Sequence, residues 1–291
     1  MKMIYYEDCM ETIERLEDKS LSLVVTSPPY SDVMSYGKSV KNKTGNEYVE
    51  WLCDILRGLY TKVTDDGSII INIGDKVTKG LRNTYIFRLI CDIEDNTDWK
   101  IYDVYIWAKK NCIPTGSNAR LNQNHEYILH LSKTNKIKAN IDGVRQPYSE
   151  SSINRYKYKL NTRNEKINED GLTIESPEPK KHSINPLGKI PFSVLEFDTA
   201  SVLKNKPTAK HPAPFHWQLP EFFIKWLTDE GDLVYDPFMG SGTTAYTCLK
   251  NNREYIGSEI NKNYIQLGVD WINIFETNTV KEETNLSELF V

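Results

Sequence analysis

Two patterns of hydrophobic residues alternate along the chain. Short apolar runs rich in β-branched residues predict buried strands at residues 4–6, 21–25, 68–73, 101–107, 127–131, 233–235 and 255–256. Apolar residues three or four positions apart predict helices at residues 10–18, 48–63, 85–93, 219–227 and 243–249. Strands that alternate with helices indicate an α/β fold, with a mostly parallel sheet covered by helices on both faces.

A polar segment interrupts this alternation between about residues 135 and 211, where Asn, Lys and Ser are frequent and apolar periods are lacking. We therefore predict one domain made of two halves, residues 1–132 and 211–291, with residues 133–210 inserted between them. The sequence Asp65-Asp66-Gly67 predicts a turn before the strand at 68–73, and residues 276–291 are expected to form a helical or frayed tail.

Composition is that of a globular protein, with 39% hydrophobic and 26% charged residues among 291. No stretch approaches the roughly 18 apolar residues of a membrane span, and the first residues lack the apolar run of a secretory signal. A cytoplasmic protein is expected. The five cysteines are scattered without a Cys-x-x-Cys pair, and the histidines lack partners at ligand spacing, so neither disulfides nor a metal site is predicted.

The net charge of −4 conceals an uneven distribution. Residues 133–210 carry 15 Lys and Arg against 9 Asp and Glu, whereas the remainder carries 21 against 31. A basic segment in an acidic protein is expected where one region approaches phosphates. The alternative is a solvated basic insertion without a nucleic-acid partner.

A glycine-containing loop, Asp-Pro-Phe-Met-Gly-Ser-Gly-Thr-Thr, begins at Asp236, at the end of a predicted strand, and leads into a helix. Glycine allows a ligand to approach the backbone closely, and a helix N-terminus favours an anionic group. The loop lacks the lysine of a phosphate-binding Walker loop and the third glycine of a dinucleotide site. Glu259, 17 residues after Gly242, is placed to accept two ribose hydroxyls. This combination fits S-adenosyl-L-methionine; the alternative is a structural turn with a surface glutamate.

A second segment, Thr-Ser-Pro-Pro-Tyr at residues 26–30, ends another predicted strand. The hydroxyl of Ser27 and the carbonyl of Pro28 could accept the two N–H groups of an amino group on a base. Pro28 and Pro29 fix the backbone, and Tyr30 could stack on a base held outside the duplex. The alternative is a rigid turn with a packed tyrosine.

With these two segments in this order, the chain resembles amino-methylating DNA methyltransferases of the permuted (β-type) group, whose catalytic motif precedes the cofactor motif. The likeness continues through residues 106–111, 125–128 and 253–257, and it covers residues 4–132 and 207–270. The segment at 211–215 departs from the commoner versions. The variable target recognition region of the family lies in the unmatched gap.

The resemblance implies a Rossmann-like fold that depends on S-adenosyl-L-methionine. It implies that Asp8 lies near the adenine of the cofactor and that Glu259 binds its ribose. The residues implied at the methionine end are Asp236, Pro237, Phe238, Gly240, Ser241, Gly242 and Thr243.

The expected reaction is direct displacement, in which an amino nitrogen attacks the methyl group. Methylation at cytosine carbon-5 requires a thiolate nucleophile, usually in a Pro-Cys dipeptide. The chain has no Pro-Cys dipeptide, so this reaction is disfavoured. In similar enzymes serine at the position of Ser27 is associated with cytosine N4, and Asp or Asn with adenine N6, so cytosine N4 is favoured and adenine N6 stays open. A catalytically silent DNA-binding protein and an RNA or protein methyltransferase are less favoured and also stay open.

The expected partner is double-stranded DNA. The candidate DNA contacts are Lys109, Arg120, Arg145, Arg155, Lys157 and Arg163. A role in restriction-modification or self-protection beside a companion restriction endonuclease is compatible with the resemblance. The recognition sequence, and the choice between monomer and homodimer, cannot be predicted from the chain.

Overall fold

The computed structural model describes residues 2–30, 45–75, 77–110, 112, 119–157, 166–167, 173–174, 185–199 and 216–273. The chain forms two compact units. The larger unit comprises Met1–Asn140 and Phe192–Val291, and the smaller comprises Ile141–Pro191. Of the helices in the described part of the chain, none is long and apolar enough to cross a membrane.

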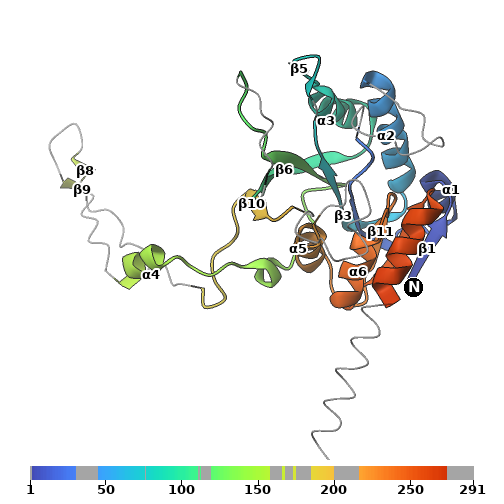
Figure 1. Ribbon diagram of the computed structural model, residues 1–291. Coiled ribbons are helices and arrows are strands. Elements are labelled where there is room, and N and C mark those ends of the chain that lie inside the picture. Colours follow the sequence, from blue (N-terminus) through green and yellow to red (C-terminus); the bar gives the residue numbers. More distant parts are fainter. Residues whose placement is uncertain are drawn as a thin grey trace, which may run out of the picture. The chain divides into compact units, whose positions relative to one another are not determined.

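An eight-stranded sheet is the centre of the larger unit (Figure 1). Its strands, in spatial order, are β1 (Lys2–Tyr6), β12 (Glu254–Glu259), β11 (Leu233–Asp236), β2 (Leu21–Thr26), β3 (Val63–Ile73), β7 (His125–Ser132), β6 (Lys100–Lys109) and β10 (Val194–Phe197). Strand β7 is antiparallel to both neighbours, and all other neighbours in this sheet pair in parallel. The predicted mostly parallel sheet is therefore confirmed.

Helices cover both faces of this sheet, as the alternating side chains of its strands require. Val24 belongs to a core with helices α1 (Cys9–Arg15), α2 (Gly45–Leu59) and α3 (Tyr85–Asn96). Its neighbours Leu23 and Val25 belong to the opposite core, with helices α5 (Gln218–Leu227) and α6 (Thr243–Lys250). A further helix over residues 262–273 packs on this second face, where the ring of Trp271 stacks on Tyr246 at 4.3 Å.

Three local predictions need correction or extension. Strand β3 begins at Val63, so the residues Asp65-Asp66-Gly67 are not a separate turn. Pairing of β2 with β3 passes from Leu21–Val63 to Leu23–Ser68, so these polar residues bulge out of the ladder. The sequence did not predict the helix at 262–273 or the short hairpin of β4 (Val77–Thr78) and β5 (Leu81–Arg82). The predicted tail at 276–291 lies outside the described residues.

The inserted segment also differs from the expectation. Strand β10 lies within residues 133–210, yet it pairs with β6 of the main sheet and buries Leu195. The separate unit is consequently shorter than the predicted insertion. It contains the short helix η1 (Ile141–Val144), helix α4 (Glu150–Lys157) and the strand pair β8 (Lys166–Ile167) and β9 (Thr173–Ile174).

Candidate active site

The two motif segments meet at one edge of the sheet. Strands β2 and β11 are adjacent and parallel, with Val24 opposite Tyr235, so the segments that follow them emerge together. A buried hydrogen bond of 2.5 Å joins them, from the Thr26 hydroxyl to Oδ1 of Asp236. The residues that it connects are 210 positions apart in the sequence.

Asp236 holds the glycine-containing loop of residues 236–244, the cofactor loop, through hydrogen bonds of its buried carboxylate. Its side chain is fully buried, and besides Thr26 it accepts hydrogen bonds from the Phe238 backbone N–H at 3.0 Å and the Thr244 hydroxyl at 2.6 Å. Burial raises the pKa of Asp236 to about 6, although these donors oppose the shift. Direct contact of Asp236 with the cofactor remains a prediction.

The loop itself depends on glycine at two positions. Gly240 and Gly242 have φ angles of +54° and +81°, in the left-handed region that disfavours other residues. A Cβ atom at Gly242 would also lie 2.8 Å from the Cα of Gly268, in the helix at 262–273. The loop can therefore bring its backbone close to a ligand while the start of α6 packs against this helix.

Glu259 faces the same loop from the end of β12. Its Oε2 accepts the Gly240 N–H at 2.9 Å, and its Oε1 accepts the Asn261 N–H at 2.7 Å. Burial raises the pKa of Glu259, and these two backbone donors oppose the shift. Each carboxylate oxygen has a second lone pair for a further donor, such as a ribose hydroxyl.

The remaining predicted cofactor residues lie at the same edge. Tyr6 pairs with Glu259, and Asp8 follows directly as the N-cap of α1, where its carboxylate accepts the Met10 N–H at 2.9 Å. In the loop, the ring of Phe238 lies 5.5 Å from that of Trp51. Pro237, Ser241 and Thr243 are buried. Asp8, two residues after β1, and Glu259, the last residue of β12, thus lie at the ends of neighbouring parallel strands.

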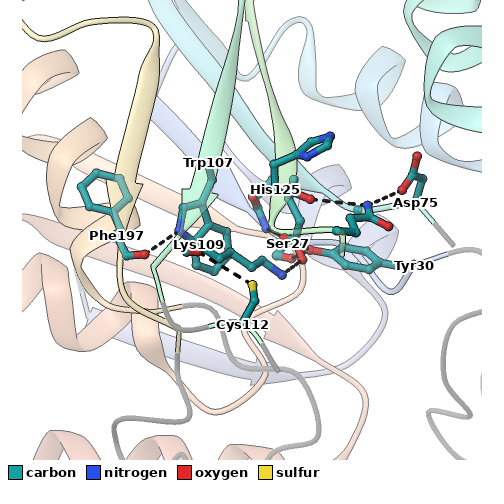
Figure 2. Close-up of polar contacts among 12 residues, drawn as sticks. Ser27, Tyr30, Asp75, Trp107, Lys109, Cys112, His125 and Phe197 are labelled. Atoms are coloured by element: carbon teal, nitrogen blue, oxygen red, sulfur yellow. Dashed lines mark hydrogen bonds and ion pairs between the residues drawn. The ribbon is translucent and has the colours of Figure 1, made fainter. Parts of the chain in front are cut away.

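The Ser-Pro-Pro-Tyr segment is held by a polar cluster (Figure 2). Ser27 donates a hydrogen bond of 3.2 Å to the Tyr30 hydroxyl, which donates one of 2.8 Å to Glu126. The ring of Tyr30 lies close to Gly74, where a Cβ would be 2.9 Å from Cε2 of the ring. Pro28 is buried and Pro29 is half-buried. Burial raises the pKa of Tyr30 well above its ordinary value, so the hydroxyl keeps its proton at neutral pH.

The sequence indicated no role for Asn72 or Glu126, and it indicated Lys109 only as a candidate DNA contact. Asn72 of β3 donates to the Tyr30 hydroxyl at 2.9 Å and to Oε2 of Glu126 at 2.7 Å, while Lys109 of β6 forms an ion pair with Oε1 of Glu126. Figure 2 shows Lys109 extending toward Ser27 and Tyr30. The available signal was a polar residue within or beside an apolar strand, at Asn72 and Glu126.

A family model described as DNA methylase, N6_N4_Mtase, matches residues 21–270. The chain belongs to this family of DNA methylases. The predicted family is therefore confirmed, and with it the predicted cofactor, S-adenosyl-L-methionine, which two similar solved structures contain. Membership in a DNA methylase family also sets aside the RNA and protein methyltransferase alternatives.

Individual DNA methyltransferases are similar over most of their length. The chain is 28% identical over 285 residues to type II methyltransferase M.PvuII of Proteus hauseri, covering 90% of this chain and 81% of that protein. It is 29% identical over 270 residues to orphan methyltransferase M.BamHII of Bacillus amyloliquefaciens, covering 87% and 89%.

Solved structures confirm the fold class. The structure of PvuII DNA methyltransferase (cytosine-N4-specific) has a TM-score of 0.68 at 24% identity, covering 92% of this chain and 85% of that one. A complex of M1.HpyAVI with SAM has a TM-score of 0.57 at 23% identity, covering 94% and 100%.

The predicted DNA contacts of this methylase lie in different surroundings. Lys109 pairs with Glu126 in the polar cluster around Tyr30, and Arg120 donates to the Gly80 carbonyl at 2.6 Å. Arg145 donates to Asp142 at 2.6 Å and to the Gly188 carbonyl at 2.9 Å. Arg155 and Lys157 lie in α4, but their side chains, and all of Arg163, lie outside the described residues. Contact with DNA remains a prediction for all six. Across the described ranges, no group of three or more His, Cys, Asp or Glu residues is arranged to hold a metal.

Proposed function

We propose that this DNA methylase transfers a methyl group from S-adenosyl-L-methionine to the exocyclic N4 of cytosine in double-stranded DNA. The observation that carries the proposal is the Thr26–Asp236 hydrogen bond, because it joins the Thr-Ser-Pro-Pro-Tyr segment to the glycine-containing loop that begins at Asp236. Ser27 favours cytosine N4, and the similar PvuII enzyme is named as cytosine-N4-specific. We further infer that the protein acts in the cytoplasm, in restriction-modification or self-protection.

The cofactor supplies an electrophilic methyl group when bound. The residues present fit it, because Gly240 and Gly242, which have no side chains, would let its methionine end approach the backbone at the start of α6. Glu259 would accept the ribose hydroxyls through its free lone pairs, and Asp8 would lie near the adenine. Asp236 contributes indirectly, since its carboxylate fixes the loop.

The amino group of the target base would be held by two acceptors. Because the Ser27 hydroxyl donates its hydrogen bond to Tyr30, the lone pairs of its oxygen remain to accept one N–H of the base. The Pro28 carbonyl would accept the other N–H, and the Tyr30 ring would stack on a base rotated out of the duplex. Holding both N–H groups directs the nitrogen lone pair toward the methyl group.

Residues 133–210 form the proposed target recognition region. Its net charge of +6 supports contact with phosphates, and Arg145, Arg155, Lys157 and Arg163 are its candidate contacts. Lys109 and Arg120 are candidates from the flanking catalytic half.

Analysis of methylated DNA tests the proposal. Unmethylated plasmid is incubated with the protein and S-adenosyl-L-methionine, digested to nucleosides and analysed by mass spectrometry, with Ser27→Ala as the control. Formation of N4-methylcytosine supports the proposal, whereas N6-methyladenine would establish the adenine alternative. Binding of DNA without methyl incorporation would reduce the protein to a catalytically silent binder. Base-resolved sequencing then gives the recognition sequence.

A further inference from the structure

The hydrogen bonds around Tyr30 have a single direction. Its oxygen accepts from the Asn72 amide and from the Ser27 hydroxyl, which occupies both of its lone pairs. The only hydrogen of the Tyr30 hydroxyl is then directed to Oε2 of Glu126 at 2.8 Å. A chain of two O–H groups therefore leads from Ser27 through Tyr30 to a carboxylate.

The orientation of Asn72 fixes this direction. Its amide nitrogen donates both to Tyr30 and to Glu126, whereas the reversed amide would place two acceptor oxygens against each other. The Asn72 side-chain oxygen is buried and has no hydrogen-bond partner among the described residues. A buried acceptor without a hydrogen-bond partner is unfavourable. The amide keeps this orientation because its nitrogen donates hydrogen bonds to both Tyr30 and Glu126.

Lys109 prepares the other end of the chain. Its ammonium group pairs with Oε1 of Glu126 and lies 4.8 Å from the centre of the Trp107 ring, while Glu126 is only 9% exposed. Lys109 thus supplies the opposite charge that a buried carboxylate requires. Oε2, the oxygen that faces Tyr30, is not used by the ion pair.

We propose that Glu126 accepts the proton that the target amino group loses, through Tyr30 and Ser27; this inference rests on the proposed function. As the nitrogen forms its bond to the methyl carbon, the bond from that carbon to the cofactor sulfur breaks and its electron pair stays on sulfur. The nitrogen then gives one proton to Ser27, Ser27 passes its own proton to Tyr30, and Tyr30 passes its own to Glu126. Both hydroxyls are restored and Glu126 becomes a neutral acid, which returns the proton to solvent by the reverse path after the product leaves.

Glu126→Gln tests the role of the carboxylate. In single turnovers with saturating cofactor and DNA, the rate of methyl transfer should fall about 10²-fold or more, the size of a general-base contribution. Cofactor and DNA dissociation constants, measured by calorimetry and fluorescence anisotropy, should stay unchanged. Glu221→Gln on α5 is the matched control, because Glu221 is 13% exposed against 11% for the Glu126 side chain and also pairs with lysines, Lys225 and Lys250. A wild-type rate in Glu126→Gln would overturn the proposal.

The solvent deuterium isotope effect separates proton transfer from simple support of Tyr30. The wild-type rate should fall in D₂O, and this fall should disappear in Glu126→Gln and in Tyr30→Phe, which keeps the ring and the Glu126–Lys109 pair. The double variant should be no slower than the slower single variant, since both changes interrupt one path. A slow Glu126→Gln that keeps the wild-type isotope effect would overturn the relay. Failure of the wild type to methylate a DNA amino group would instead refute the proposed function.

Discussion

Asp236→Asn should change how the stability of the protein depends on pH. The pKa of Asp236 is raised from 3.8 to about 6, which corresponds to about 3 kcal/mol of unfavourable free energy for the buried carboxylate. The folded state binds the proton more tightly than the unfolded state. This cost is therefore absent below about pH 3.8, increases as the pH rises, and is complete above about pH 6.

Urea denaturation of both proteins without cofactor, at a series of pH values, measures this effect. Asparagine does not titrate, so the unfolding free energy of Asp236→Asn minus that of the wild type should become more positive by about 2 kcal/mol between about pH 4.5 and 7.5. The absolute difference also contains altered hydrogen bonds to Thr26 and Thr244, but these do not depend on pH. A difference that is constant with pH, or that becomes more negative, would refute the reasoning.

Three further predictions concern Glu259, Ser27 and Gly242. Glu259→Gln should weaken cofactor binding by about 1.5–3 kcal/mol, the value of hydrogen bonds to a charged group, without changing DNA affinity, and unchanged affinity in calorimetry would contradict the ribose assignment. Ser27→Ala should lower the single-turnover rate far more than cofactor affinity, and equal losses in both would contradict its role toward the base. Gly242→Ala should destabilise the protein by more than the roughly 1–2 kcal/mol of a positive φ, because its Cβ meets Gly268. The matched control is Gly231→Ala, with a φ of +83° and nothing within 4 Å of the added Cβ, and equal changes in thermal unfolding would contradict the packing argument.

The sequence predicted those parts of the fold whose signals are local. The strand β2 is apolar at four of its buried positions and ends at Ser27-Pro28, so its existence and its end could both be recognised. The same holds for β11, which ends at Asp236-Pro237. Strand β10 was missed because it lies in a polar segment and buries a single residue of its four, Leu195.

The polar cluster around Tyr30 could not be predicted because it depends on register between distant strands. The Tyr30–Glu126 contact joins residues 96 positions apart, and it requires β3 and β7 to pair antiparallel with Ile73 opposite Tyr127. Nothing in the local pattern of residues 125–132 specifies this pairing. Asn72 and Glu126 were visible as polar residues near apolar runs, but their partners were not.

The buried contact between Thr26 and Asp236 explains why the order of the two motifs can be permuted. The contact requires only that β2 and β11 lie side by side, which the sheet provides whichever strand comes first in the chain. Strand β1 fills the position beside β12, so the N-terminal strand completes the cofactor side of the sheet. The ionised carboxylate of Asp236 lowers the unfolding free energy by about 3 kcal/mol at neutral pH. Its hydrogen bonds nevertheless hold the glycine-containing loop and the Thr-Ser-Pro-Pro-Tyr segment together. Because the carboxylate of Asp236 accepts hydrogen bonds from Thr26 on one side and from Phe238 and Thr244 on the other, a change at this residue should disturb both motif segments together.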